Sequence, residues 1–481
     1  MKPEVFIRVN FDHEIGLGHL VRCIALADML KKDFNIRFFY REGTIPDSTY
    51  LGDTGFSFTR IDNETEFIEK LSKERIVVLD GYHFNIDYQW QIKSKGCLLV
   101  CIDDVHDQHF AADLIINHAP GIHKEAYSTP FYTQFALGTA YALLRQPFLL
   151  SARKKDEEKK RKEINDTVMI CFGGADPLNI TEKALATARK FEQLSKIIVV
   201  TGGFYQYADS LTDHLKADTR TEWHTNLSDI AMAEVMMRSD IAIVQSSGIL
   251  FESLSSGCMA VTGVYIYNQK FVYSNFVNSN AAYGAEDFSE LPLSKALSAA
   301  ISNTTGKHVS LIDGHSDERL SKIFHQLALS AKIQVQRATM DEVDLTYKWA
   351  ADPRIRNFSF NRHSISYEEH TTWLQSKLED TKCVYLIAKL DMDPIGSIRF
   401  DYKENTQVIS YLVDPSFQGQ GLGQMLLLAG IQYMLTYVPG VKPCFTGYVV
   451  DNNFPSLKAF RKLGFSESKV DGNYKFELVL S

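Results

Sequence analysis

The stretch Ile15-Gly16-Leu17-Gly18-His19-Leu20-Val21-Arg22 decides the fold, because it joins an apolar run at residues 5–9 to a helical pattern that continues through Leu30. A strand that breaks at glycines and resumes as a helix points backbone N–H groups at the space above the strand, where the helix dipole favours negative charge. We therefore expect a loop that holds an anionic substrate. His19 stands where the helix begins, and its imidazole can exchange protons near neutral pH. A tight turn whose histidine only caps or packs explains the same residues equally well.

The composition indicates a chain with two or three cores, since its 481 residues exceed the usual size of one domain and 45% of them are hydrophobic. A net charge of -8 gives no electrostatic footprint for nucleic acid or for an anionic membrane surface. The 7 cysteines are odd in number and several lie in apolar runs, so we expect reduced core thiols rather than disulfides or a metal cage. No uncharged apolar stretch is long enough to cross a bilayer, which predicts a soluble cytoplasmic protein.

Short runs of β-forming apolar residues alternate with helical patterns along residues 1–331. Such alternation predicts doubly wound α/β layers with parallel strands. A charged segment at residues 153–163 interrupts the alternation, and we expect a solvated linker or helix there. The two sides of this interruption predict two Rossmann-like halves, residues 1–150 and 151–331. The expected strands are residues 5–9, 35–40, 75–80, 98–103 and 114–117 in the first half, and 167–172, 196–201, 240–245 and 259–264 in the second.

Polar residues follow three of the expected strands in the first half. Because the carboxyl ends of strands line the ligand crevice of an open α/β sheet, we expect these residues to face the same cleft as His19. His106 and His109 add possible metal ligands, but no adjacent cluster completes a coordination shell, so a solvated loop is the better interpretation. The three polar motifs are Asp80-Gly81-Tyr82, Asp103-Asp104 and Asn117-His118.

The second half contains a strand that ends in Ser246-Ser247-Gly248 and opens a helix. This arrangement supplies hydroxyls and backbone N–H groups for phosphate oxygens, and Glu252, one turn into the helix, can accept hydrogen bonds from ribose hydroxyls. Serines that cap helices are common without any ligand, so this segment alone favours a structural role. Gly173-Gly174, earlier in the same half, adds another glycine-rich anion loop. Two Rossmann-like halves that each carry such a loop are typical of nucleotide-sugar enzymes.

The last third has a different pattern. Residues 334–339, 383–389, 395–402 and 407–413 resemble successive antiparallel strands with polar alternation. The glycine-rich loop Gln418-Gly419-Gln420-Gly421-Leu422-Gly423 and an apolar helix follow them. A lone glycine loop is weak evidence of cofactor binding. The loop is specific in combination with the strand and the helix after it, which carry Asn453, Ser456, Phe460 and Gly464-Phe465.

This last third, residues 332–481, resembles the GNAT family of N-acetyltransferases. Gln418, Gly421 and Gly423 match the family's acetyl-CoA pyrophosphate loop, and Asn453, Ser456 and Gly464-Phe465 match its later cofactor motif. Consecutive amides at a helix N-terminus bind a pyrophosphate without a metal or a lysine. The resemblance therefore implies acetyl-CoA as co-substrate. The residues implied to bind it are Val413, Gln418, Gly419, Gln420, Gly421, Leu422, Gly423, Asn453 and Ser456.

The acceptor side of this domain is less defined. Many members of the family carry a tyrosine that protonates the leaving thiolate where this chain has Phe460, so the resemblance names no acid here. The residues in the region where the family builds its acceptor pocket are Trp349, Arg354, Arg356, His370 and Trp373.

Residues 1–331 resemble the UDP-sugar hydrolases of pseudaminic acid biosynthesis, which are relatives of the MurG-type glycosyltransferases with the GT-B fold. The resemblance implies that His19 is the general base for water and that Tyr82 and Asn268 contact the sugar or orient the water. It also implies that no metal is required. The matching segments are residues 15–22, Asp80-Gly81-Tyr82, Asp103-Asp104, residues 137–145, Gly173-Gly174-Ala175-Asp176-Pro177, residues 246–252 and Asn268-Gln269. The residues implied to bind the UDP-sugar are Gly16, Gly18, Arg22, Gly173, Gly174, Ser246, Ser247, Gly248, Glu252 and Gln269.

Together, the resemblances predict a GT-B-type pair of Rossmann-like domains followed by a GNAT domain. The predicted reactions are acetylation of UDP-4-amino-4,6-dideoxy-N-acetyl-β-L-altrosamine with acetyl-CoA, and then hydrolysis of UDP-2,4-diacetamido-2,4,6-trideoxy-β-L-altropyranose. Helix N-termini near Gly174 and Ser247 are expected to stabilise the departing UDP, which leaves Gly16 and Gly18 on the sugar side. A GT-B glycosyltransferase or a non-catalytic UDP-sugar sensor, fused to an N-acetyltransferase of proteins or amino sugars, remains an alternative. The expected partners are UDP-amino sugars and acetyl-CoA; neither a membrane nor an oligomeric state is indicated.

Overall fold

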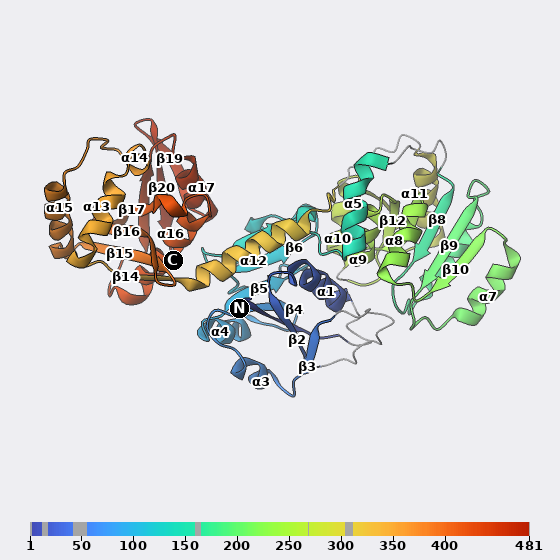
Figure 1. The fold of residues 1–481 in the computed structure, drawn as a ribbon. Helices are drawn as coiled ribbons and strands as arrows, with labels where there is room; N and C mark the ends of the chain where they lie inside the picture. The colour runs from blue at the N-terminus through green and yellow to red at the C-terminus, as the bar shows by residue number, and fades with distance from the viewer. Residues whose placement is uncertain are drawn as a thin grey trace. The chain divides into compact units, whose positions relative to one another are not determined.

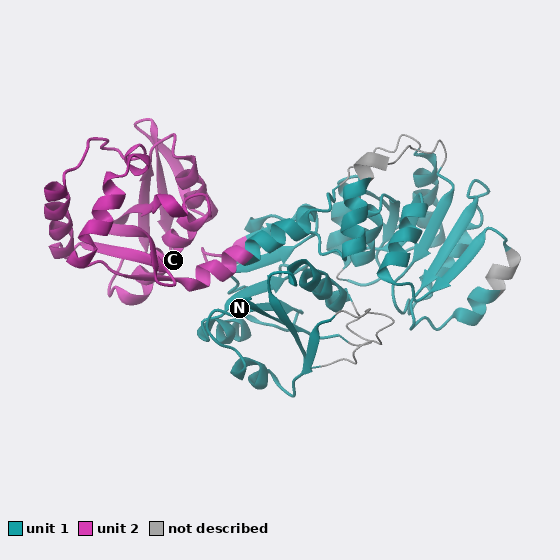
Figure 2. Ribbon diagram, viewed as in Figure 1, with its two compact units in different colours: residues 1–129, 135–324 teal, residues 130–134, 325–481 magenta. Residues whose placement is uncertain are grey.

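The structure is a computed structural model that describes residues 2–11, 18–41, 55–158, 165–267, 269–303 and 311–480. The chain divides into two compact units, residues 1–129 with 135–324, and residues 130–134 with 325–481 (Figure 2). Among the described residues, no helix has both the length and the apolar character needed to span a membrane.

The first sheet of unit 1 has its strands in the order β3-β2-β1-β4-β5-β6-β7. β1 pairs in parallel with both β2 and β4, so the chain builds outward from β1 and then returns to its other side. This reversal creates a switch point between β1 and β4, where ligands bind in sheets of this type. The strands are β1 (Glu4–Val9), β2 (Asn35–Tyr40), β3 (Ser57–Arg60), β4 (Ile76–Asp80), β5 (Leu98–Ile102), β6 (Leu114–Asn117) and β7 (Gln134–Leu137). The helices that accompany them are α1 (Gly18–Leu30), α3 (Glu64–Glu69) and α4 (Ile86–Ser94), with 3-10 turns η1 (Lys124–Ala126) and η2 (Thr139–Tyr141) (Figure 1).

The second sheet has the same kind of reversal in its strand order, which is β10-β9-β8-β11-β12-β13. β8 pairs in parallel with β9 and β11, so its switch point lies between β8 and β11. The strands are β8 (Thr167–Cys171), β9 (Lys196–Thr201), β10 (Thr221–Thr225), β11 (Ile241–Gln245), β12 (Met259–Gly263) and β13 (Ala282–Gly284). The helices are α5 (Gln146–Glu158), α6 (Ile180–Ala188), α7 (Ala208–Ala217), α8 (Asp229–Arg238), α9 (Gly248–Ser255), α10 (Gln269–Asn278) and α11 (Glu290–Ser302).

Central strands of both sheets are buried along their whole length, as expected when helices cover both faces. Ser316 begins the long helix α12 (Ser316–Lys332) by donating its hydroxyl to the carbonyl of Ala142, 2.7 Å away. Arg319, one turn later, donates to the carbonyl of Ala140 at 2.9 Å. These bonds tie the first turns of α12 to the segment that precedes α5.

Unit 2 contains a mixed sheet in the order β14-β15-β16-β17-β18-β20-β19. Its pairs are antiparallel except β17–β18, which is parallel and covers only residues 407–409 of β17. β17 runs on to Val413 without this partner, so the two strands part. The strands are β14 (Ile333–Arg337), β15 (Cys383–Leu390), β16 (Asp393–Lys403), β17 (Thr406–Val413), β18 (Cys444–Val449), β19 (Ser466–Val470) and β20 (Asn473–Val479). The helices are α13 (Val343–Ala351), α14 (Pro353–Arg356), α15 (Tyr367–Glu379), α16 (Leu422–Tyr437) and α17 (Phe454–Lys462), with 3-10 turns η3 (Met340–Glu342) and η4 (Pro415–Phe417). The predicted α/β class, with parallel Rossmann-like sheets and a mixed sheet at the C-terminus, is confirmed.

Candidate functional site

His19 and Arg22 lie one turn apart on α1, so both side chains reach Asp80 at the end of β4. His19 Nδ1 is 2.6 Å from Asp80 Oδ1 and 3.0 Å from Arg22 Nη2; because a carboxylate oxygen only accepts, we assign the shorter contact to a hydrogen bond from a proton on Nδ1. Arg22 donates two hydrogen bonds to the same carboxylate, from Nε to Oδ2 and from Nη2 to Oδ1, each at 2.6 Å. The neutral imidazole therefore presents Nε2 as its unprotonated nitrogen.

Asp80 is ionised at neutral pH despite being 1% exposed. Burial alone would raise its pKa, but the charge of Arg22 and the hydrogen bonds from Arg22 and His19 outweigh burial and hold the pKa of this carboxyl well below its usual range. Cys23 donates its thiol to Asp80 Oδ2 at 3.3 Å. Burial and the adjacent Asp80 raise the pKa of this thiol, so Cys23 stays protonated. Asp80 thus acts as a fixed negative charge behind His19.

Tyr82 stands beside His19 at the same edge of the sheet. The two rings meet edge to face with centroids 5.1 Å apart. The Tyr82 hydroxyl donates to Asp104 Oδ2 at 3.1 Å, and Arg22 Nη1 donates to the same oxygen at 2.9 Å. Asp104 Oδ1 is buried and has no hydrogen-bond partner among the described residues. The structure therefore brings together the predicted His19, Tyr82 and Arg22.

His118 follows β6 and also lies near this cluster. Burial, followed by the charge of Arg22, lowers the pKa of His118 to about 4, so its ring is neutral at pH 7. Its Nδ1 accepts the backbone N–H of Leu143 at 3.1 Å. The ring packs on Phe251 of α9, with centroids 4.2 Å apart. His118 thereby connects the end of β6 to the helix that begins at the second switch point.

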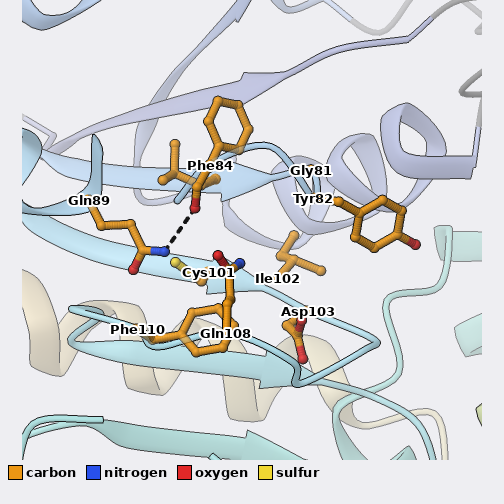
Figure 3. A pocket seen from close by; sticks show the side chains of 10 residues that line it. Gly81, Tyr82, Phe84, Gln89, Cys101, Ile102, Asp103, Gln108 and Phe110 are labelled. Atoms are coloured by element: carbon orange, nitrogen blue, oxygen red, sulfur yellow. Dashed lines mark hydrogen bonds between the residues drawn. The ribbon is translucent and has the colours of Figure 1, made fainter. Parts of the chain in front are cut away.

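A small pocket opens at the carboxyl ends of β4 and β5 (Figure 3). Tyr82 and Asp103 lie at one end of the pocket, while Gln89 donates to the carbonyl of Phe84 at the other, at 3.0 Å. Asp103 accepts the hydroxyl of Tyr127 at 2.9 Å. Burial and the neighbouring Asp104 raise the pKa of Asp103. The pocket is therefore lined by apolar and polar side chains, and Tyr82 brings one of its ends beside the His19 cluster.

The two histidines after Asp104 have partners of their own. The His106 ring meets the ring of Phe271 at 4.8 Å, and His109 Nδ1 is 2.7 Å from the hydroxyl of Ser128. Within the described parts of the chain, no group of three or more acidic, histidine or cysteine residues is arranged to hold a metal ion.

The N-terminus of α9 is open. Ser247 caps the helix with extended backbone, but its hydroxyl makes no capping hydrogen bond. Gly248 is exposed, and a Cβ placed on it would have no neighbour within 4 Å. The helix N-terminus consequently lacks a cap from the Ser247 side chain, and the space beside Gly248 is open. Ser246 is different, because it is 1% exposed and its hydroxyl is 2.9 Å from that of Thr262.

Glu252, predicted to meet a ribose, has a protein partner that the sequence analysis missed. Arg145 donates to Glu252 Oε1 through Nη2 at 2.7 Å and Nε at 3.0 Å. Burial raises the pKa of Glu252 in spite of this pair. Nearby, Gln269 accepts the N–H of Tyr265 at 3.1 Å and donates to Gln245 at 3.3 Å. Both predicted residues are thus held in place by hydrogen bonds at the carboxyl ends of β11 and β12.

The expectation of a free helix N-terminus near Gly174 is wrong. The helix after this glycine pair, α6, begins at Ile180, and Asp176 accepts its first amides, those of Ile180 at 2.9 Å and Thr181 at 2.7 Å. A carboxylate therefore already occupies this helix end. Gly174 instead allows close packing, since a Cβ on Gly202 would lie 2.5 Å from its Cα. Gly173, at φ +81°, faces Gln245.

Some predicted residues lie outside the described part of the chain. These are Ile15, Gly16 and Leu17 of the first glycine loop and Asn268, which is predicted, like Tyr82, to contact the sugar or orient the water. Gly18 is described as the exposed first residue of α1, with no atom within 4 Å of a Cβ placed on it.

In unit 2 the predicted cofactor loop lies between α16 and the end of β17 that is no longer paired with β18. Gly419 and Gly421 have φ of +83° and +79°, a conformation that favours glycine, and Gly421 caps α16 without a side-chain bond. The side chain of Gln418 donates back to the carbonyl of Val413 at 3.4 Å. Leu422 is buried in the core and anchors the loop, whereas Gln420 is exposed. The loop thus leaves the first amides of α16 available for an anion.

The second cofactor motif begins α17. Asn453 accepts the backbone N–H of Ser456 at 3.2 Å, and the Ser456 hydroxyl is 2.9 Å from the hydroxyl of Tyr411. Gly423 of the first loop packs on the Tyr411 ring, 3.5 Å from a Cβ placed on the glycine. Tyr411 therefore connects the two predicted cofactor motifs, although sequence reasoning did not single it out. The alternation within β17 was the available signal, because it places Tyr411 and Val413 on one face of the strand.

Residues in the expected acceptor region have mixed roles. Trp349 is buried and donates its indole N–H to Asp414 at 2.6 Å. His370 is buried against the Thr346 hydroxyl at 2.9 Å, and burial lowers its pKa. The other three lie nearer the surface: Arg354 pairs with Asp352, Arg356 donates to the carbonyls of Asn361 and His363, and Trp373 packs under Arg399.

Residues 346–465 match the model of the Acetyltransferase (GNAT) family. An uncharacterized protein of Methanocaldococcus jannaschii is 22% identical over 473 residues, which is 95% of each chain. The UDP-2,4-diacetamido-2,4,6-trideoxy-beta-L-altropyranose hydrolase of Campylobacter jejuni is 23% identical over 274 residues, covering 56% of this chain and 93% of the relative. The crystal structure of the Campylobacter jejuni N-acetyltransferase PseH is 22% identical, covers 31% of this chain and 99% of its own, and has a TM-score of 0.25.

The GNAT family match and the hydrolase homology confirm the resemblance in both parts of the chain. About half of the chain is homologous to a UDP-sugar hydrolase, and the C-terminal part contains a GNAT domain. The protein is therefore an enzyme with a hydrolase-like region and an acetyl-CoA-dependent acetyltransferase domain.

Proposed function

We propose that this chain catalyses two consecutive steps of pseudaminic acid biosynthesis. Its GNAT domain acetylates the 4-amino group of UDP-4-amino-4,6-dideoxy-N-acetyl-β-L-altrosamine. Its hydrolase region then converts UDP-2,4-diacetamido-2,4,6-trideoxy-β-L-altropyranose to UDP and the free sugar. The observation that carries the proposal is the His19–Asp80 pair beside Tyr82 at the first switch point, because it presents an oriented general base where a sugar would bind.

In the hydrolytic step, His19 Nε2 takes a proton from water as the oxygen attacks the anomeric carbon and the bond to UDP breaks. Asp80 stabilises the imidazolium that forms, because its carboxylate stays ionised and 2.6 Å from Nδ1. We assign to Tyr82 a contact with the sugar hydroxyls or the water, and Asp104 Oδ2 accepts the hydrogen bond that orients the Tyr82 hydroxyl. A positioned general base contributes roughly 10² to 10⁴ in rate.

The departing UDP is assigned to the second half. The uncapped N-terminus of α9 offers amides and the Ser247 hydroxyl to the diphosphate, and Gly248 leaves room for close approach. Glu252 and Gln269 lie at the same edge of the sheet for the nucleoside. This arrangement neutralises the leaving group with backbone dipoles, so the proposed mechanism uses no metal.

In the acetylation step, the amides at the start of α16 hold the pyrophosphate of acetyl-CoA. The free 4-amine attacks the thioester carbonyl directly, and the carbon–sulfur bond breaks. The GNAT family match over residues 346–465 supports acetyl-CoA as the donor, and the homology of about half of the chain to a UDP-sugar hydrolase supports a nucleotide sugar as the acceptor.

We also propose the finer organisation: a GT-B pair formed by residues 1–150 and 151–331, followed by the acetyltransferase at 332–481. The reactions take place in the cytoplasm, where acetyl-CoA and nucleotide sugars occur together.

Incubating the protein with the diacetamido UDP-sugar in water alone tests the hydrolytic function. The proposal predicts free sugar and UDP in equal amounts. A glycosyltransferase would release little free sugar without an acceptor, and a non-catalytic sensor would bind the UDP-sugar without turnover. Either outcome would contradict the proposal.

A further inference from the structure

Phe460 is a packing residue. Its ring stacks on Phe476 with centroids 5.0 Å apart and is 2% exposed. Its Cζ, the atom that would carry a tyrosine hydroxyl, occupies the space over Gly447, where a Cβ would lie only 2.3 Å from it. Close packing against a strand leaves this position without a donor. A proton donor for the leaving thiolate must therefore come from another residue.

Tyr411 lies where β17 and β18 separate. The last residue of β17 that pairs with β18 is Ile409, so Tyr411 is just beyond the paired part of the two strands. Its ring packs 6.0 Å from Phe460, centroid to centroid. Its hydroxyl meets that of Ser456, which precedes Phe460 by one turn of α17. Tyr411 thus places a phenol next to the position that lacks one.

The surroundings of Tyr411 keep it protonated. Burial raises the pKa of Tyr411 to about 12, while the hydrogen bond with Ser456 opposes the shift. Its ring also touches Gly423, in the first turn of the helix that is proposed to hold the pyrophosphate. A neutral phenol beside a cofactor loop can donate to a sulfur that becomes negative as its bond to carbon breaks.

We propose that Tyr411, assisted by Ser456, is the catalytic residue that donates a hydrogen bond and then a proton to the CoA sulfur during acetyl transfer. The inference rests on the proposed acetyltransferase function. The amine nitrogen forms a bond to the acetyl carbon, the carbon–sulfur bond breaks, and its electron pair goes to sulfur. Sulfur gains the Tyr411 proton, and the proton lost by the attacking nitrogen restores the phenol through Ser456 or water. The step therefore balances without a further reactant.

The test uses the full chain with CoA bound and follows the ultraviolet absorbance of the thiolate against pH. A donor to sulfur stabilises the thiolate, so Tyr411→Phe is expected to raise the pKa of the bound thiol by about one unit or more. In the same variant, the acetyl transfer rate to the UDP-4-amino sugar is expected to fall roughly 100-fold. The dissociation constant of acetyl-CoA, measured by calorimetry, should stay within about a factor of two. Tyr437→Phe, an exposed tyrosine at the end of α16, is the matched control and should change none of the three values.

An unchanged thiol pKa together with an unchanged transfer rate in Tyr411→Phe would overturn the assignment. A loss of acetyl-CoA binding with an unchanged thiol pKa would also overturn it, because that result describes a residue that only shapes the loop. The thiol titration needs no acceptor. If the wild type failed to acetylate the UDP-4-amino sugar while Tyr411→Phe still raised the thiol pKa, the proposed acceptor would be wrong and the role of Tyr411 would stand.

Discussion

Asp80 collects donors from three neighbours while being almost completely buried: the imidazole of His19, the guanidinium of Arg22 and the thiol of Cys23. A buried carboxylate persists only when such partners compensate its lost hydration. Its position behind His19 fixes which imidazole nitrogen is free. The charge of Asp80 is therefore part of the proposed base even though the carboxylate lies behind the ring.

We expect the ionised carboxylate of Asp80 to make the stability of the folded protein depend on pH. Because the pKa of Asp80 is lowered in the folded state, its stabilising effect is complete above the unfolded value of about 3.9 and is lost as the pH falls below it. Asp80→Asn should lower Tm at pH 7, and the gap to the wild type should narrow below about pH 4. Thermal unfolding of both proteins from pH 3 to pH 8 would measure the gap. A gap that stayed constant down to pH 3 would show that Asp80 is not held ionised by its partners.

At this scale, sequence predicted the functional groups better than their partners. His19 and Tyr82 stand together as expected, because both follow strands whose carboxyl ends meet at one edge. The pairing of Glu252 with Arg145 was not predicted, since the two residues are 107 positions apart and only the fold brings them together. The contact of Ser246 with Thr262 was not predicted for a similar reason. Only the fold shows that Ser246, and not the adjacent Ser247, is the serine that faces Thr262.

Helix α9 provides a test at the scale of an element. Gly248→Asp would place a carboxylate at the uncapped N-terminus, where it should stabilise the helix by about 0.3 to 1 kcal/mol while repelling a diphosphate. We expect UDP affinity to fall at least roughly tenfold, a loss of about 1.4 kcal/mol, while Tm is maintained or raised.

Gly248→Ala is the matched control, since a Cβ meets no neighbour there, and it should bind UDP nearly as the wild type does. Calorimetric titration with UDP, alongside thermal unfolding, measures both effects. Undiminished UDP binding by Gly248→Asp would remove α9 from the proposed site.

The loop before α16 provides the corresponding test in unit 2. Gly421→Glu would put bulk and negative charge where the pyrophosphate of acetyl-CoA is expected, at a φ of +79° and next to the Gln326 side chain. Acetyl-CoA binding should be lost, and hydrolysis of the diacetamido UDP-sugar should be unchanged because it takes place in the other unit. Calorimetry with acetyl-CoA and a UDP-release assay measure the two effects. Normal acetyl-CoA binding by this variant would exclude the loop from the cofactor site.

Inner strands of the two parallel sheets were predicted closely, while the edge strands β3 and β10 were not. Strands β2, β6 and β9 have the expected bounds, because their residues form runs rich in apolar side chains. β3 and β10 lie at sheet edges, and their half-exposed residues dilute that pattern. The error at Gly174 has another cause: a glycine turn predicts a helix start, but the sequence pattern did not show that Asp176 would cap it.

At the scale of the whole molecule, the alternation of strands and helices predicted two parallel sheets, and the change of pattern near residue 333 predicted the mixed one. The return of the chain across each parallel sheet then locates two switch points, one with His19 and one with the start of α9. The order of the strands does not determine the stereochemistry of the sugar, because an enzyme distinguishes stereoisomers through contacts from a few side chains. The proposed substrate class, UDP-amino sugars, rests on the presence of a hydrolase-like region and an acetyltransferase domain in one chain.

In the proposed function, the acetyltransferase domain acts first and the hydrolysis that depends on His19 follows in the same protein. The most direct measurement mixes His19→Ala with acetyl-CoA and the UDP-4-amino sugar and follows the products by mass spectrometry. We expect this variant to accumulate the diacetamido UDP-sugar and to release UDP roughly 10² to 10⁴ times more slowly than the wild type. His109→Ala, whose ring contacts Ser128, should convert the substrate fully to UDP and free sugar. Release of UDP by His19→Ala at the wild-type rate would rule out His19 as the general base, and the absence of any acetylated UDP-sugar would rule out acetylation as the first step.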